Sequence, residues 1–169
     1  MRRLSLVLAA VTMLALGTNV GAAGAATHTV YTVGTAKVVP NVSLMLTFHY
    51  SPGVVSVRSG DTLKGVDRSG APHTISIVRP SQIPKTAAAM ESCDQGICGQ
   101  FEQGHAPHGE AGPFVPIINV GPAGLNQPGD SMLIPPHGSN SAKVTAPAHT
   151  TLYFFCAFHP WMQGRIIVT

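Results

Sequence analysis

The sequence predicts an all-β sandwich, and three observations carry that prediction. Charged residues make up only 10% of the chain. The chain contains 18 glycines and 14 prolines, which punctuate it at short intervals. Between them lie short runs rich in β-branched and aromatic residues, and short strands separated by turn signals are typical of a β-sandwich. This pattern is lost between about residues 79 and 127, so we expect a long loop-rich insertion within one domain.

The N-terminus has the features of a secretory signal peptide. Arg2 and Arg3 precede an apolar run over residues 4–16, and small residues follow up to Ala26. This order of segments predicts a signal peptide over 1–26 and a single domain over 27–169. The alternative, an uncleaved anchor, is less favoured because a bilayer span takes about 20 apolar residues. We therefore expect an extracytoplasmic monomer, periplasmic or secreted, that is not stably inserted in the membrane after cleavage.

The strands can be assigned in order from periodicity and turn signals. Residues 42–48 alternate partly, which is typical of a half-buried strand, and residues 73–78 alternate after a Gly-Ala-Pro loop. Residues 81–90 could begin a short helix, and 114–120 form a brief apolar run. The last two strands enclose a short loop as a hairpin. The predicted strands are 27–33, 42–48, 54–57, 63–66, 73–78, 131–134, 142–146, 150–155 and 163–168.

The charge balance argues against a nucleic-acid partner. Without Arg2 and Arg3, eight basic residues stand against seven acidic ones, which leaves a net charge of about +1 with neutral histidines. Proteins that bind nucleic acid carry a basic patch or stripe, and this chain has none.

Three cysteines leave one unpaired in an exported protein. Cys93 and Cys98 lie close enough around Gly96 to form a disulfide. Cys156 is then the odd thiol, which a metal ion could occupy. The other pairing, Cys156 with either of the first two, stays open at this point.

Cys156, His159 and Met162 place a thiolate, an imidazole and a thioether within seven residues, directly after a β-rich run. Soft sulfur ligands together with imidazole select copper, and a trigonal site of two histidines and one cysteine with a weak axial methionine transfers electrons. The second histidine has to come from elsewhere in the chain. His73, at the start of the predicted strand 73–78, is the candidate.

This arrangement resembles the cupredoxins, the small blue copper proteins. The Cys-x₂-His-x₂-Met spacing is similar to the ligand loop of amicyanin and pseudoazurin, and the resemblance covers about residues 28–78 and 128–169. It implies a Greek-key sandwich with one type 1 copper held by His73, Cys156, His159 and Met162. It also implies a non-enzymatic carrier of single electrons that meets redox-protein donors and acceptors transiently. The alternatives are copper storage, delivery or sensing, and an open copper site if Met162 is not a ligand.

The resemblance also implies roles for residues next to the ligands. The backbone N–H of Thr74 should point at the thiolate. Amicyanin-like loops usually carry proline where this chain has Phe158, whose N–H could give the sulfur a second hydrogen bond. Pro160 and Trp161 could form a docking patch beside the second histidine, although Trp161 could equally pack inward.

The insertion offers a second, weaker metal site. His105 and His108 lie three residues apart within a run rich in glycine and proline. Paired imidazoles can bind a metal ion, and a loop without a metal is the competing interpretation.

Overall fold

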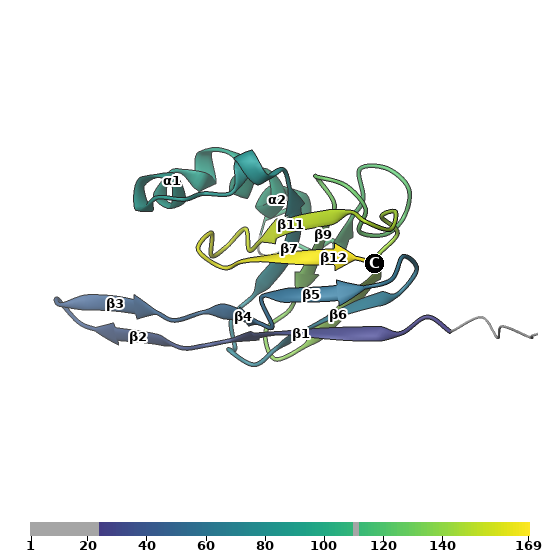
Figure 1. The fold of residues 1–169 in the computed structure, drawn as a ribbon. Coiled ribbons are helices and arrows are strands. Elements are labelled where there is room, and N and C mark those ends of the chain that lie inside the picture. The colour runs from purple at the N-terminus through teal and green to yellow at the C-terminus, as the bar shows by residue number, and fades with distance from the viewer. Residues whose placement is uncertain (1–23, 110–111) are drawn as a thin grey trace, which may run out of the picture.

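The computed structural model describes residues 24–109 and 112–169, which form a sandwich of two β-sheets (Figure 1). The predicted signal peptide lies almost wholly outside the described residues. The first sheet has the order β10 (Ser139–Lys143), β6 (Thr62–Asp67), β1 (Thr27–Val33) and β4 (His49–Ser51). The second sheet has the order β5 (Val54–Val57), β12 (Gln163–Val168), β11 (Thr151–Phe155), β7 (His73–Val78), β9 (Ser131–Ile134) and β8 (Ile117–Ile118). The predicted all-β sandwich is confirmed.

The core lies between the two sheets and explains the strand patterns. All six residues of β7 are buried, so this strand forms the centre of the second sheet. Apolar burial of this kind contributes about 1.5–3 kcal/mol for each large side chain. The strands β1, β5, β7, β9 and β12 begin and end where the sequence predicts them. The strand predicted over 142–146 lies three residues earlier, as β10 (Ser139–Lys143). This strand begins with the polar run Ser-Asn-Ser, which a search for apolar periodicity does not detect.

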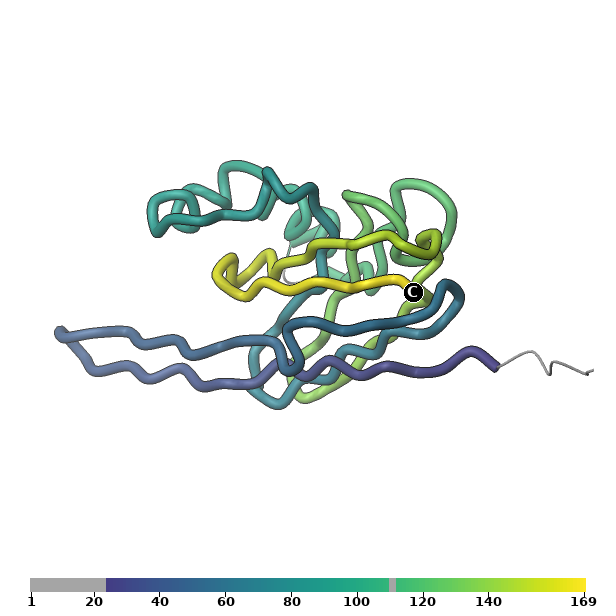
Figure 2. Tube along the Cα trace, viewed as in Figure 1, coloured from purple at the N-terminus to yellow at the C-terminus, as the bar shows by residue number. Residues whose placement is uncertain are grey.

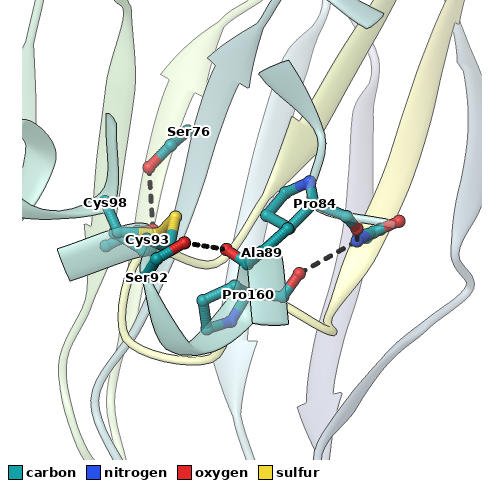
Figure 3. The surroundings of a disulfide bond; sticks show 10 residues. Ser76, Pro84, Ala89, Ser92, Cys93, Cys98 and Pro160 are labelled. Carbon is teal, nitrogen blue, oxygen red and sulfur yellow. Dashed lines mark hydrogen bonds between the residues drawn. A yellow bond between two sulfur atoms is a disulfide. The ribbon is translucent and has the colours of Figure 1, made fainter. Parts of the chain in front are cut away.

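The insertion is more ordered than predicted. It contains η1 (Pro80–Gln82), α1 (Ala87–Glu91), η2 (Cys93–Gln95) and α2 (Ile97–His105). The disulfide between Cys93 and Cys98 is confirmed, and Figure 3 places it beside Ser76 of β7. With Phe101, it packs on the outer side of β7 and β11 in a second apolar cluster. The expectation of a loop-rich span is therefore wrong for its first half, where the buried contacts of Cys93, Cys98 and Phe101 stabilise η2 and α2.

A two-stranded hairpin, β2 (Ala36–Val39) and β3 (Ser43–Leu46), projects beyond the end of the sandwich (Figures 1 and 2). β3 pairs with β2 alone. Val42 is 78% exposed and Leu44 is 62% exposed, so the predicted half-burial of 42–48 is wrong there. Only the end of that run is buried, at Phe48.

Among the described residues, no helix has both the length and the apolar character needed to cross a membrane.

Candidate metal centre

Three of the four predicted copper ligands meet at one end of the second sheet. His73 opens β7, and Cys156 follows β11, which is the antiparallel neighbour of β7. His159 lies in the turn that leads to β12. The Nδ1 atoms of His73 and His159 are 3.2 Å apart. The Cys156 Sγ atom lies 3.7 Å from the first of them and 3.6 Å from the second.

These three atoms fit one metal ion. The circle through a triangle with sides of 3.2, 3.6 and 3.7 Å has a radius of about 2.0 Å, and zinc, a comparable first-row ion, lies about 2.0 Å from nitrogen and about 2.3 Å from sulfur. One ion could therefore bind all three donors without moving the backbone. No other group of three or more His, Cys, Asp or Glu donors meets in this way within the part of the chain that the structure describes.

The ligand loop is closed by three backbone hydrogen bonds. The N–H of Cys156 donates to the carbonyl of Met162 at 3.0 Å, which continues the pairing of β11 with β12. The N–H of His159 donates to the carbonyl of Cys156 at 3.2 Å, and the N–H of Met162 donates to the carbonyl of His159 at 2.8 Å. The spacing of the ligands in sequence therefore corresponds to two tight turns whose geometry is fixed by the sheet.

The Cys156 thiol is wholly buried, and it is the free cysteine of the described residues. Burial raises the pKa of this thiol to about 11, although nearby backbone N–H groups act to lower it. One of them is the N–H of Thr74, which donates to Sγ at 3.3 Å, as the resemblance implied. The N–H groups of His159 and Phe158 also lower the pKa of the thiol. Without a cation the sulfur keeps its proton, so a metal ion has to displace it.

A hydrogen-bond relay fixes the tautomer of His73. Its Nε2 lies 2.7 Å from the hydroxyl oxygen of Ser69, which donates to Asp67 Oδ1 at 2.7 Å. Because the Ser69 hydroxyl donates its only hydrogen to the Asp67 carboxylate, it can only accept from His73. The Nε2 atom of His73 therefore carries a hydrogen and donates it to the Ser69 oxygen. The lone pair of Nδ1 then faces Cys156. Second-layer partners of this kind orient metal ligands and raise their basicity.

Both ligand rings are neutral near pH 7. Burial, together with the neighbouring His159, lowers the pKa of His73 to about 4, and Asp67 opposes the shift. Burial also lowers the pKa of His159 to about 4. Neutral imidazoles present free lone pairs, which metal binding needs.

Two aromatic side chains enclose the histidine rings. The ring of Phe48 lies 5.4 Å from the His73 ring and 4.8 Å from the His159 ring, and it meets both edge to face. The Trp161 ring lies 5.2 Å from the His159 ring, also edge to face, and its indole N–H donates to the Phe48 carbonyl at 3.2 Å. Trp161 is 37% exposed. It therefore covers His159 and also presents part of its ring to solvent.

The remaining predicted site residues lie as follows. Met162 is 1% exposed and belongs to the same core cluster as Cys156. Pro160 is buried, because its side of the loop faces the insertion; Gln163 Nε2 donates to the carbonyls of Pro160 and Pro84 at 3.0 and 2.7 Å (Figure 3). Of the two residues predicted to form a docking patch, only Trp161 is exposed.

The predicted histidine pair of the insertion is divided between the interior and the surface. His105 is fully buried, and both ring nitrogens are hydrogen-bonded, to the Val115 carbonyl at 2.6 Å and to the Ser131 hydroxyl at 2.7 Å. His108 is exposed. His105 therefore has no ring nitrogen free to bind a metal ion together with His108 in this conformation.

Sequence reasoning missed three residues that shape the centre: Phe48, Asp67 and Ser69. An apolar alternation that ends at Phe48 and Tyr50 was a signal for the first. The turn signal Asp-Arg-Ser-Gly just before His73 was a signal for the next two, because Asp and Ser side chains in such turns hydrogen-bond locally.

No protein-family model and no curated protein sequence matches the chain. Several solved structures are similar to it. Auracyanin A, titled a "blue" copper protein from Chloroflexus aurantiacus, is 17% identical; the match covers 86% of this chain and all of that one, with a TM-score of 0.48. A purple cupredoxin from Nitrosopumilus maritimus is 13% identical over 83% of this chain and 98% of that one, with a TM-score of 0.44. Plastocyanin from Dryopteris crassirhizoma is 18% identical; the match covers 84% of this chain and all of that one, with a TM-score of 0.40.

Proposed function

We propose that this chain is a cupredoxin that carries single electrons by means of one copper ion. The observation that supports this most is the triangle of two Nδ1 atoms and one sulfur, whose sides of 3.2, 3.6 and 3.7 Å suit one trigonal ion. Two histidines and a cysteine with a weak axial methionine form the electron-transfer type of copper site. Copper bound there supplies the Cu(II)/Cu(I) couple.

The protein's own residues hold the donors in one geometry. His73 is fixed by Ser69 and Asp67, and Cys156 and His159 lie in a loop closed by backbone hydrogen bonds. Phe48 packs edge to face against both rings, of which His73 is fully buried. Because the donors need not move when the charge of the site changes, electron transfer meets a small structural barrier. With Met162 as axial ligand, no coordination position is left for a substrate, which favours a carrier over an enzyme.

We place electron exchange at His159, because its ring lies at the edge of the domain beside the partly exposed Trp161. Redox-protein partners would meet this edge transiently. We also propose that residues 1–26 direct export. The Cys93–Cys98 disulfide supports an oxidising compartment, where such bonds persist.

The test is an absorption spectrum of the purified protein loaded with Cu(II). We expect an intense charge-transfer band that is lost on reduction and returns on oxidation, over repeated cycles. A Cys156→Ala variant should not show this band. A wild-type protein without such a band would overturn the proposal. Release of Cu(I) to a chelator on reduction, without reversible cycling, would instead favour storage or delivery.

Met162 is tested separately by Met162→Leu, which keeps an apolar side chain of similar size. If the thioether is the axial ligand, this variant should shift both the absorption bands and the reduction potential. A variant identical to wild type in both would assign Met162 to the core alone. Trp161→Ala should slow electron exchange with a redox protein and leave the spectrum unchanged.

A further inference from the structure

Strand β1 begins beside a carboxylate that contacts three nitrogen atoms. The backbone N–H of Ala26, the residue before β1, donates to Asp61 Oδ1 at 2.8 Å. The other oxygen, Asp61 Oδ2, lies 2.8 Å from His28 Nε2 and accepts the N–H of Arg58 at 2.9 Å. Asp61 is 4% exposed, so its carboxylate is held against the start of the strand.

This carboxylate has no permanent cation as its partner. Among the described residues, no lysine or arginine side chain forms an ion pair with Asp61, and the one ionisable partner is His28. A histidine carries a charge only when it is protonated. Aspartates are rarely buried unless they are paired. A positive charge on the nitrogen of Ala26 would therefore complete the surroundings of Asp61.

The sequence carries a cleavage signal at that same nitrogen. Signal peptides end in a small-residue site of the A-x-A type. Within the small-residue run 21–26, Ala23-Gly24-Ala25 is the one triplet with alanine at both outer positions. Cleavage after this triplet breaks the peptide bond between Ala25 and Ala26. The N–H that Asp61 accepts then becomes the α-ammonium group of the mature chain.

Cuts at the neighbouring bonds would not give this result. Cleavage after Ala26 would remove the donor to Asp61 and also the Ala26 carbonyl, which accepts the N–H of Thr62 at 2.8 Å. Cleavage after Gly24 would place the ammonium group on Ala25, one residue away from the nitrogen that the carboxylate contacts. Of the three cuts, the one before Ala26 keeps both contacts and makes one of them charge-assisted, which is roughly twice as strong as a neutral hydrogen bond.

We propose that export cuts the chain between Ala25 and Ala26 and that Asp61 is the binding site for the resulting α-ammonium group. This inference rests on the proposed export of the chain, and it places the end of the signal peptide one residue earlier than the predicted 1–26. A signal peptidase would hydrolyse the bond. Water supplies the hydroxyl group that leaves with the Ala25 carboxyl and the hydrogen that goes to the Ala26 nitrogen, and the amine then takes up a proton.

The new terminus lies away from the hairpin β2–β3. Figure 1 shows that β1 starts at the end of the sandwich that also carries the C-terminus, whereas the hairpin projects from the opposite end. The charged and titratable residues around the amine are Asp61, His28, Arg58, Lys143 of β10, which pairs with Thr62, and the C-terminal residue 169. Of these, Asp61 contacts the Ala26 nitrogen.

The amine gives the stabilisation a pH dependence of known sign. An α-ammonium group has an ordinary pKa of about 7.7–8.0, and a carboxylate beside it should raise this pKa. The N–H groups of Arg58 and Ala26 hold the pKa of Asp61 at about 2, so the carboxylate is charged wherever the amine titrates. The stabilisation is therefore present below about pH 8 and is lost as the pH rises through the raised pKa of the amine.

The first experiment expresses the full chain in a bacterial host and measures the intact mass of the exported protein. We expect the mature chain to begin at Ala26. Ala25→Leu, which places a large side chain at the cut, should prevent this product. A mature chain that begins at Thr27 or at any other residue overturns the processing site. A protein that keeps Met1 overturns the proposed export together with this inference.

The second experiment compares urea unfolding of two chains, one beginning at Ala26 and one beginning at Gly24, in which Ala26 keeps an ordinary peptide N–H. At pH 7 the equilibrium constant for unfolding should be about threefold to fivefold smaller for the chain that begins at Ala26. The difference should vanish by about pH 11. Asp61→Asn, made in both chains, should remove the difference. His28→Gln, the matched control at the other partner of the carboxylate, should keep it.

Two results would refute the ammonium site: equal stability of the two chains at pH 7, or a difference that persists in Asp61→Asn. If Asp61→Asn does not fold, nitrogen NMR of the Ala26 amine in wild type gives the test, because an amine without a bound carboxylate should titrate at about 7.7–8.0. These measurements need no copper. A protein that shows the charge-transfer band but has an unbound amine would refute this inference and leave the copper function standing.

Discussion

Replacing Asp67 with asparagine tests whether the anchor of His73 is as tightly built as its contacts indicate. The Oδ1 atom accepts hydrogen bonds from the Thr32 hydroxyl at 2.8 Å and from the N–H of Ser69 at 2.9 Å. The Oδ2 atom accepts from the N–H groups of Gly70 and His137, each at 2.8 Å. Asparagine keeps the shape but has a single oxygen, so its amide nitrogen would face at least two N–H donors.

The magnitude follows from those two donors. A buried donor left without an acceptor costs about 1–3 kcal/mol, so Asp67→Asn should lower the free energy of unfolding by about 2–6 kcal/mol. We expect about 3 kcal/mol, because the turn after β6 can partly relax. Flipping the amide does not avoid the cost, because Oδ1 also faces donors. The assay is urea unfolding of the copper-free protein at neutral pH. A loss below about 1 kcal/mol would show that the donors are not held as the structure places them.

Asp61 supplies a matched control for the effect of Asp67 on the metal centre. Its carboxylate also accepts backbone N–H bonds, from Ala26 at 2.8 Å and Arg58 at 2.9 Å. It lies just before β6, whereas Asp67 ends that strand, so the two are about 20 Å apart. Asp67→Asn removes a negative charge beside the His73 ring and should raise the reduction potential. Asp61→Asn should destabilise the fold and leave the potential unchanged. Equal shifts in the two variants would refute the coupling through Ser69.

Three further predictions concern other contacts. Phe48→Ala should cost about 3–5 kcal/mol of unfolding free energy, measured in urea, and Phe48→Leu clearly less, because only the alanine leaves a large cavity beside the two ligand rings. Phe158→Pro removes an N–H from the sulfur and should lower the reduction potential, whereas Phe158→Leu keeps the N–H and should not; an unchanged potential in the proline variant would exclude this bond. The N–H groups of Arg58 and Ala26 hold the pKa of Asp61 at about 2. Wild type should therefore be more stable than Asp61→Asn above about pH 3.9, the pKa of an aspartate in the unfolded chain. It should lose that advantage as the pH falls toward the pKa of Asp61 in the folded protein. A difference that is independent of pH in acid unfolding curves would contradict this.

The group of His73, Cys156 and His159 could be predicted because most of it is local. Cys156 and His159 lie in one hairpin loop, and a strand run before them fixes where the loop begins. To predict His73, it was enough to find a second strand that begins with a histidine. These are features of spacing and periodicity, which a sequence carries directly.

The supports of the ligands could not be predicted in the same way. Phe48, just before β4, reaches both rings from the first sheet's side, and this contact depends on how the two sheets are stacked. Asp67 reaches His73 through Ser69 within the loop between β6 and β7. The turn signal there shows that the Asp and Ser side chains will hydrogen-bond, but it does not show that His73 shares the bond.

The missed helix α2 and the wrongly predicted burial of the hairpin have opposite physical causes. In α2, Gly99 and Gly104 lower helix propensity and obscure a buried face formed by Cys98, Phe101 and His105. In the hairpin, apolar alternation predicted burial, but no sheet covers Leu44. Periodicity shows that a strand has an apolar face and does not show whether the fold covers that face.

The insertion is best understood as part of the metal centre. Its disulfide cluster packs against Phe155 and Ala157, the residues on either side of Cys156. Gln163 joins Pro84 of the insertion to Pro160 of the ligand loop by two hydrogen bonds. A loop held only by its own turns could still shift relative to the strand that carries His73. This loop packs on one side against the core and on the other against a cross-linked insertion, so it is held from both sides.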